Sequence, residues 1–219
     1  MSTNHTHQIS PDQPYQPGYL DSEDHEGESG YDGRLLRGER SKVHIAEAMI
    51  ELIEEGNSKP TARLIAERAG VSLRLVFHHF DDLEAVFQKA AMIQAGRHWR
   101  KVVTIPPTGT TADRIEATVR LRRQLYVAIT PVRRVVTTKA IDDEYLQKLM
   151  AAGRRRLRME LATTFEPELE RAGAQAGTLL DAIEAVSNWE WWNAVRSNSR
   201  KSAVATQRLM QYSLTALLA

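Results

Sequence analysis

Residues 61–80, TARLIAERAGVSLRLVFHHF, hold the side chains whose types and spacing best fit a chemical task. The pattern predicts two short helices joined by a small turn at Ala69-Gly70-Val71, as in a helix-turn-helix. Arg74 in the second helix can donate two hydrogen bonds to one guanine in a DNA major groove. The residues that this helix would present to a groove are Ser72, Leu73, Arg74, Phe77 and His78. The expected chemistry is hydrogen bonding and apolar contact with base edges.

A longer helix and two caps would hold these side chains in place. Apolar residues at three- and four-residue spacing predict a helix from about Arg37 to Gly56-Asn57, where a left-handed stop ends it. Those apolar residues are Val43, Ala46, Ile50 and Ile53. Thr61 and Ser72 stand where a hydroxyl can cap each short helix. The residues expected to lock the helix pair onto the long helix are Ile65, Ala66, Val71, Val76 and Phe80.

The rest of the chain is also predicted to be helical. Asp81 with Glu84 three residues later predicts a capping box for a helix from Leu83 to about Val103, before Pro106-Pro107. Further helices are expected over about 111–129, 132–138, 141–165, 175–197 and 200–218, separated by Pro131, Pro167 and Gly173/Gly177. No strand pattern with a period of two is found. The expected fold class is therefore all-α.

Within residues 37–92 the sequence resembles the TetR family of transcriptional regulators (TetR/AcrR type). The resemblance is carried by Glu55-Gly56, Thr61, Ile65-Ala66, Ala69-Gly70-Val71-Ser72 and an aromatic residue ahead of His79-Phe80. It implies a sequence-specific DNA-binding regulator, a repressor that a small-molecule effector releases from a pseudo-palindromic double-stranded DNA operator. It also implies a homodimer, and three parts of the chain: an acidic disordered tail (1–33), a three-helix helix-turn-helix domain (34–82) and a helical effector-binding and dimerisation domain (83–219).

The resemblance also implies roles for single residues. Thr61 would contact a phosphate, and the five residues of the second short helix would occupy recognition-helix positions. Phe77 replaces the usual Tyr, so the phosphate bond from that hydroxyl is lost. Leu83 stands where many members have Lys, so a phosphate contact there would come from the helix N-terminus. Basic residues that would add sequence-independent affinity are Arg34, Arg37, Arg40 and Lys42.

For the helical domain we expect an effector pocket and a dimer interface. Apolar and aromatic pocket candidates are Trp99, Leu121, Leu125, Tyr126, Ile129, Tyr145, Leu149 and Trp189. Arginines that could receive an anionic effector, or that are simply surface or salt-bridged groups, are Arg122, Arg123, Arg133 and Arg134. The interface candidates, on what we predict to be the last two helices, are Leu180, Ile183, Trp191, Leu209 and Tyr212. The Trp189-x-Trp191-Trp192 cluster favours a core or interface role over a ligand cage.

Composition excludes several classes of protein. The 219 residues contain no Cys, which removes disulfides, cysteine nucleophiles and thiolate metal sites. No apolar run is long enough for a membrane span and no secretory signal is found, so we expect a cytoplasmic protein. Residues 1–33 hold seven acidic and no basic side chains, which leaves 29 basic against 21 acidic residues, a net +8, in the remainder. Histidines in the tail are interpreted as polar tail residues rather than metal ligands, so no metal and no cofactor is predicted.

Two other functions remain open at this point. An all-helical enzyme would need a nucleophile–base pair or a carboxylate pair at a spacing that can be recognised in the sequence, and none is found. A helical interaction module could hold a protein partner through the acidic tail and the Trp-rich end. The segment from Arg34 to Met92 holds nine basic and nine acidic residues, so it has no net positive charge. This balance supports the second alternative, because a DNA-binding surface is expected to be basic.

Overall fold

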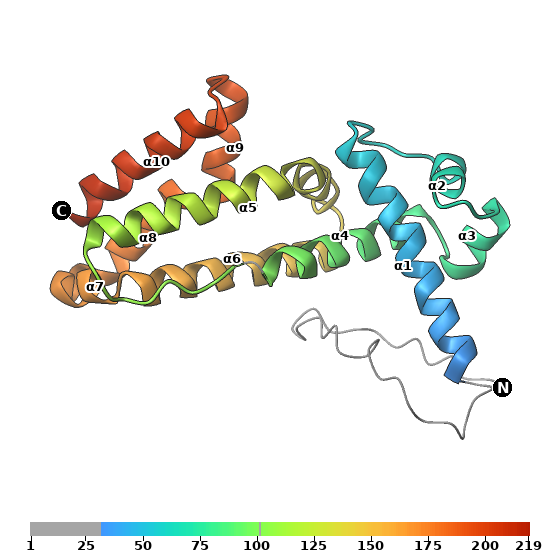
Figure 1. Cartoon of the computed structure of the whole chain (residues 1–219), viewed down its shortest axis with the longest axis horizontal. Helices are drawn as coiled ribbons and strands as arrows, with labels where there is room; N and C mark the ends of the chain where they lie inside the picture. Colours follow the sequence, from blue (N-terminus) through green and yellow to red (C-terminus); the bar gives the residue numbers. More distant parts are fainter. Residues whose placement is uncertain (1–31, 101) are drawn as a thin grey trace. The chain divides into compact units, whose positions relative to one another are not determined.

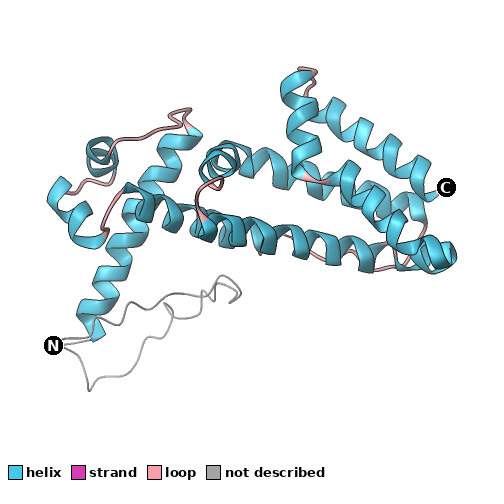
Figure 2. Cartoon of the chain, turned by 180° about the vertical axis from the view of Figure 1, so that it is seen from behind, coloured by secondary structure: helices cyan, strands magenta, loops and turns pink. Residues whose placement is uncertain are grey.

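The computed structural model describes residues 32–100 and 102–219. In chain order the helices are α1 Asp32–Glu54, α2 Ala62–Arg68, α3 Leu73–His79, α4 Leu83–Trp99, α5 Thr111–Lys139, α6 Glu144–Thr164, α7 Glu166–Ala172, the 3-10 helix η2 Gly173–Gln175, α8 Ala176–Ser187, α9 Trp189–Asn198 and α10 Ala203–Leu218. Every regular element among these residues is helical (Figure 2), which confirms the all-α prediction. None of the described helices combines the length and apolar character that crossing a membrane requires.

The predicted disordered tail lies outside the described residues except at its end. Asp32 and Gly33 already belong to α1, so this helix begins about five residues before the position, Arg37, that the apolar pattern indicated. Residues 32–34 are Asp, Gly and Arg, so the apolar spacing that begins at Val43 gives no signal for that start.

The helices form two compact units. The first unit comprises residues 32–96 and 135–152 among those described, and the second comprises residues 97–134 and 153–219. In the first unit α1, α2 and α3 pack against one another (Figure 1). Their shared core consists of Ile45, Ala46, Met49, Ile50, Ile53, Ile65, Ala66, Val76 and Phe80. This three-helix core is apolar, so it holds α3 by the burial of apolar surface.

The second unit has a larger core with a strong aromatic share. Its buried members are Val102, Ile115, Val119, Leu125, Tyr126, Leu161, Phe165, Ile183, Trp189, Trp192, Met210, Leu214 and Leu218. The rings of Tyr126 and Trp192 lie 5.9 Å apart in a tilted arrangement. The Tyr126 hydroxyl donates to the Ser187 carbonyl at 2.8 Å, and burial raises the pKa of this tyrosine to about 12. Trp189 donates from its indole N–H to the Thr130 hydroxyl at 3.1 Å.

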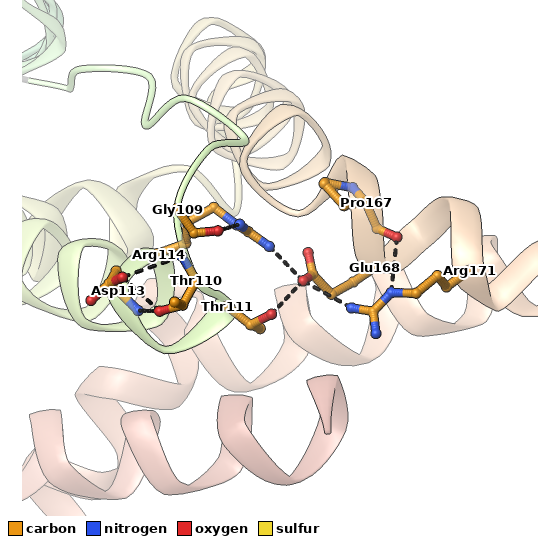
Figure 3. A network of polar contacts seen from close by, with 8 residues as sticks. All are labelled: Gly109, Thr110, Thr111, Asp113, Arg114, Pro167, Glu168 and Arg171. Atoms are coloured by element: carbon orange, nitrogen blue, oxygen red, sulfur yellow. Dashed lines mark hydrogen bonds and ion pairs between the residues drawn. The ribbon is translucent and has the colours of Figure 1, made fainter.

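Charged side chains also lie inside the second unit (Figure 3). Glu168 on α7 accepts hydrogen bonds from Thr111 and Arg114 at the start of α5, and from Arg171 on its own helix. Arg114 donates in addition to the Gly109 carbonyl at 2.8 Å. These bonds hold the pKa of the buried Glu168 carboxyl below its usual range, against the opposing effect of burial, which is the largest single influence. The network connects the beginning of α5 to α7.

Of the two prolines expected to separate helices, one does not do so. Pro131 was expected to separate two helices, yet α5 continues through it. Pro131 lacks the N–H that would bond the Val127 carbonyl. Val127 is exposed, and α5 continues without that backbone bond. Pro167 was expected to separate two helices, and α6 does end before it, at Thr164. Pro167 itself lies in the first turn of α7, a helix that was not predicted, where a missing N–H costs little.

Two caps also differ from prediction. The helix expected over 175–197 is divided at Asn188, whose extended backbone ends α8 and whose side chain accepts from the Trp191 N–H at 2.7 Å. A helix end of this kind is easily missed in the sequence, because the residues on both sides of Asn188 are equally apolar. At the start of α4, Asp82 rather than Asp81 accepts from the Ala85 N–H at 2.8 Å. This helix ends at Trp99 rather than near Val103.

Candidate nucleic-acid interface

The turn between α2 and α3 is fixed by backbone and side-chain hydrogen bonds. Gly70 has φ +63°, a conformation that glycine adopts without steric cost. The Val71 N–H donates to the Ala66 carbonyl at 3.0 Å. His44 on α1 contributes a bond that the sequence did not indicate: its Nε2 lies 2.9 Å from the Ala69 carbonyl. Because that carbonyl can only accept, the His44 nitrogen donates, and the turn is tied directly to α1.

Both short helices begin with the predicted caps. The Thr61 hydroxyl accepts from the Leu64 N–H at 3.3 Å, and the Ser72 hydroxyl accepts from the Leu75 N–H at 3.1 Å. Each cap satisfies one of the N–H groups that a helix start leaves without an intrahelical partner. The two caps therefore confirm where α2 and α3 start.

One side of α3 is buried and the other faces outward. Val76 is fully buried, together with Ile65 of α2, and Phe80 follows as a core residue. Of the predicted locking residues only Val71 is partly exposed. On the opposite side Ser72, Leu73, Arg74, Phe77 and His78 are all exposed. Phe77 is 49% exposed, which is unusual for an aromatic side chain on a helix that has a core to pack against.

Arg74 has no ion pair or hydrogen bond with any residue that the structure describes. The other basic side chains nearby differ in this respect. Arg68 pairs with Glu55 at 2.6 Å and with Glu51 at 3.4 Å, and the bond from Arg68 lowers the pKa of Glu55. Arg63 pairs with Glu67 at 3.0 Å. Acidic groups of the first unit therefore neutralise side chains away from α3 and leave Arg74 available.

A second group of charges lies around the end of α3. Lys42 and Lys89 both contact Glu39, at 3.1 and 3.2 Å. His79 is partly buried, and its pKa is lowered by burial first and then by the positive charges of His78 and Lys42. Its ring lies 5.3 Å from that of His78. Arg37 and Arg40 are exposed on α1, while the side chain of Arg34 lies outside the described residues.

The predicted effector residues are divided between the two units. Tyr145 and Leu149 belong to the first unit, where Tyr145 lines a recess with acidic neighbours such as Glu84 and Asp143. The remaining six belong to the second unit. Among these, Leu125, Tyr126 and Trp189 are buried in the core, and Trp99 and Ile129 pack against it. Leu121 is partly exposed on α5.

The predicted interface residues also have unequal environments. Tyr212 is 76% exposed and Leu209 is exposed on the same helix, α10. Leu180 and Trp191 are partly exposed. Ile183 has no exposed surface, because it belongs to the core beneath α8.

The four arginines considered for an anionic effector have different surroundings. Arg133 lies on the Trp189 ring at 5.4 Å and contacts Glu190 at 3.3 Å. Arg134 donates to Asn193 and Ser197 of α9. Arg123 is partly exposed, and Arg122 is completely buried. The salt-bridged interpretation therefore holds for Arg133 and for Arg122, which pairs with Glu160. Among the described residues no group of His, Asp and Glu side chains is arranged to hold a metal ion.

Comparison with known proteins is consistent with this geometry. Residues 45–90 match the family model of bacterial regulatory proteins, tetR family. A proposed TetR-family transcriptional regulator from Mesorhizobium loti superposes with a TM-score of 0.57 at 20% identity, over 83% of this chain and 96% of that one. A transcriptional regulator from Rhodococcus gives 0.61 at 17% identity, over 81% and 96%. A proposed regulator from Pseudomonas aeruginosa gives 0.56 at 18%, over 88% and 96%. None of the curated protein sequences matches this chain significantly.

Proposed function

We propose that the chain is a member of the tetR family of bacterial regulatory proteins, whose family model matches residues 45–90, and that it binds an operator through the outer side of α3. It is a transcriptional regulator of the DNA-binding kind. Arg74 is assigned to a base edge, where a guanidinium can bond a guanine bidentately. Thr61 is assigned to a phosphate, and Ser72, Leu73, Phe77 and His78 to the neighbouring groove surface. Arg40 is assigned to the phosphate backbone.

One observation carries this proposal most strongly: Arg74 is exposed and unpaired on a helix whose opposite side is fully buried. Three carboxylates of the first unit, those of Glu39, Glu55 and Glu67, are occupied by other basic side chains, namely Lys42, Lys89, Arg68 and Arg63. An equal total of basic and acidic residues therefore still leaves a positive group at the proposed contact. Phe77 adds an exposed ring suited to contact with a thymine methyl group or with sugar carbons.

We propose further that the protein acts as a homodimer on a pseudo-palindromic operator. A two-fold dimer presents two copies of α3 to two half-sites, so the symmetry of the protein is repeated in the DNA. The exposed Tyr212 and Leu209 on α10, with the partly exposed Leu180 and Trp191, are the side chains assigned to the dimer contact. A partner would remove apolar surface from water that a lone chain leaves exposed.

We propose that the protein is a cytoplasmic repressor and that a small molecule releases it from DNA. A ligand can lower operator occupancy only if it binds more tightly to a conformation that fits the operator poorly. We assign the helix-turn-helix domain to residues 34–82 and the effector-binding and dimerisation domain to residues 83–219. We assign the protein a regulatory rather than a catalytic role.

Selection of bound DNA from a random pool tests the proposal. We expect enrichment of a pseudo-palindrome, followed by a steep fall in the affinity of the selected DNA as salt rises. An enriched sequence without two-fold symmetry would overturn the dimer assignment. Failure to enrich any sequence, together with weak dependence on salt, would overturn DNA recognition and favour a protein-interaction module.

A further inference from the structure

We propose that Thr118 and Arg122 on α5 form the polar end of a binding site for a small uncharged molecule. The ligand class is a mostly apolar molecule with one hydrogen-bond acceptor, such as a ketone, an aldehyde or an ether. This inference rests on the proposed function, because it assigns a ligand chemistry to the effector-responsive part of the regulator.

The Arg122 guanidinium has an unusual shortage of partners. Its side chain is 1% exposed, and its Nη2 donates to the carboxylate of Glu160 on α6 and to the Leu157 carbonyl. Neither its Nε nor its Nη1 has a hydrogen-bond partner among the described residues. Buried N–H groups without partners are rare in folded proteins, because they lose their bonds to water on folding. The unused groups therefore indicate a missing acceptor.

Thr118 lies one helical turn before Arg122, and its hydroxyl also lacks a hydrogen-bond partner. Thr118 is completely buried, and its hydroxyl oxygen has no hydrogen-bond partner in the described part of the chain. Residues four positions apart share one side of a helix. Two adjacent side chains on α5 thus offer three unused polar atoms to one acceptor-bearing molecule.

Arg114 is a buried arginine of the same unit that has more hydrogen-bond partners than Arg122. It lies on the same side of α5, eight residues before Arg122, and is also paired with a buried glutamate, Glu168. There Nη1 has the Gly109 carbonyl and Nη2 has the carboxylate, while Thr111 and Arg171 share the same carboxylate oxygen (Figure 3). Its Nη1 bond is the one that Arg122 lacks. The Arg114 Nε also has no hydrogen-bond partner among the described residues, so the difference between the two arginines lies at Nη1.

The charge of the site selects an uncharged ligand. Glu160, itself 3% exposed, already neutralises Arg122, so a carboxylate ligand would place a second negative charge beside Glu160 in an interior of low polarity. A neutral acceptor can use the free N–H groups without that cost. This differs from the anionic effector considered from the sequence, in which Arg122 was one of four candidate receiving groups.

The neighbouring side chains set the apolar part of the ligand. Tyr126 follows Arg122 by one turn, and its ring packs near Trp192. Its hydroxyl is already used by the Ser187 carbonyl, so Tyr126 offers an aromatic face rather than a free hydrogen-bonding group. Val119 and Leu125 on the same helix are buried in this core. A compact ring with one carbonyl oxygen matches these surroundings.

Three probes of similar size test the assignment on the purified full chain without DNA. They are acetophenone, which has a neutral acceptor, ethylbenzene, which has none, and benzoate, which is an anion. Dissociation constants are measured by ligand-observed NMR. We expect acetophenone to bind about tenfold more tightly than either of the others, as one added hydrogen bond to a charged group implies. Equal binding of acetophenone and ethylbenzene would overturn the proposal and leave a trapped water as the partner of Arg122, and tighter binding of benzoate would overturn the uncharged class.

Variants test whether the preference for acetophenone over ethylbenzene depends on Thr118 and Arg122. Replacing both charges, Arg122→Met with Glu160→Met, avoids an unpaired buried charge and should reduce the tenfold preference to about one. Thr118→Val keeps the side-chain shape and should lower the preference while leaving the ethylbenzene constant unchanged, so it tests the site even if the double variant fails to fold. Arg120→Met, an exposed position on α5, is the matched control and should keep the preference. Retention of the full preference in both test variants would overturn the site. DNA selection does not depend on any of these probes, so failure here is distinguishable from failure of the regulator assignment.

Discussion

Arg74 and Arg122 show that the two units use the same side chain in opposite ways. Arg74 is exposed without a partner above an apolar core, whereas Arg122 is enclosed and paired with Glu160. In the first unit the groups that fold the helices are therefore different from the groups that are free to bind. In the second unit the same buried charges hold the fold and offer hydrogen bonds. Substitutions should separate stability from recognition in the first unit and couple them in the second.

The largest expected effect is on the buried charge pair. Glu160→Ala leaves Arg122 buried without its carboxylate, and removing one partner of such a pair costs about 3–5 kcal/mol in free energy of unfolding. Urea unfolding followed by circular dichroism measures it. The control is the double substitution to Met, which should come within about 1 kcal/mol of the original protein, since both desolvated charges are gone. A loss below about 1 kcal/mol for Glu160→Ala would mean that water reaches the pair, and the contrast with Arg74 would weaken.

Tight packing in the second unit gives the next effect. A Cβ added to Gly153 would lie 2.6 Å from Cζ2 of Trp99, whose ring also stacks under Arg156 at 5.8 Å. Gly153→Ala should therefore lower stability by about 1–3 kcal/mol, as overpacking of a core does. Gly177 on α8 has open space around its Cβ position, so Gly177→Ala is the matched control and should not destabilise. If Gly153→Ala proved neutral, the Trp99 ring would have to be free to move.

In the first unit, Arg74→Ala should change recognition without changing stability. Loss of a bidentate base contact costs about 1–3 kcal/mol of discrimination at one base pair in each half-site, measured with selected operators altered at single positions. Its unfolding free energy should stay within about 0.5 kcal/mol, because the side chain is exposed and unpaired. Arg40→Ala is the comparison: as a phosphate contact it should weaken all sequences alike and reduce the salt dependence. Unchanged base preference in Arg74→Ala would remove the assigned role.

The same contrast explains what could be predicted from the sequence. Around α3 the caps Thr61 and Ser72, the turn glycine and the apolar spacing are local signals, and each lies where it was expected. The His44 bond to the Ala69 carbonyl joins residues 25 positions apart and leaves no local signal. The pairing of Arg122 with Glu160 depends likewise on how α5 and α6 pack. Long-range partners of polar side chains could therefore not be predicted from the sequence. The division at Asn188 is a different case, because its cap on the Trp191 N–H is local and lies within an apolar stretch.

The smallest effect concerns protonation at the end of α3. Because burial and the charges of His78 and Lys42 lower the pKa of His79 in the folded state, while Glu39 opposes them, the unfolded chain binds more protons at mildly acidic pH. Stability from this group is therefore present above its usual pKa of about 6.5 and is lost as pH falls toward the folded value. His79→Gln should reduce the difference in unfolding free energy between pH 7.5 and pH 5.5. His78→Gln, which removes only one of the contributing charges, should reduce it less. An equal or larger pH dependence in His79→Gln would place the acid-sensitive group elsewhere.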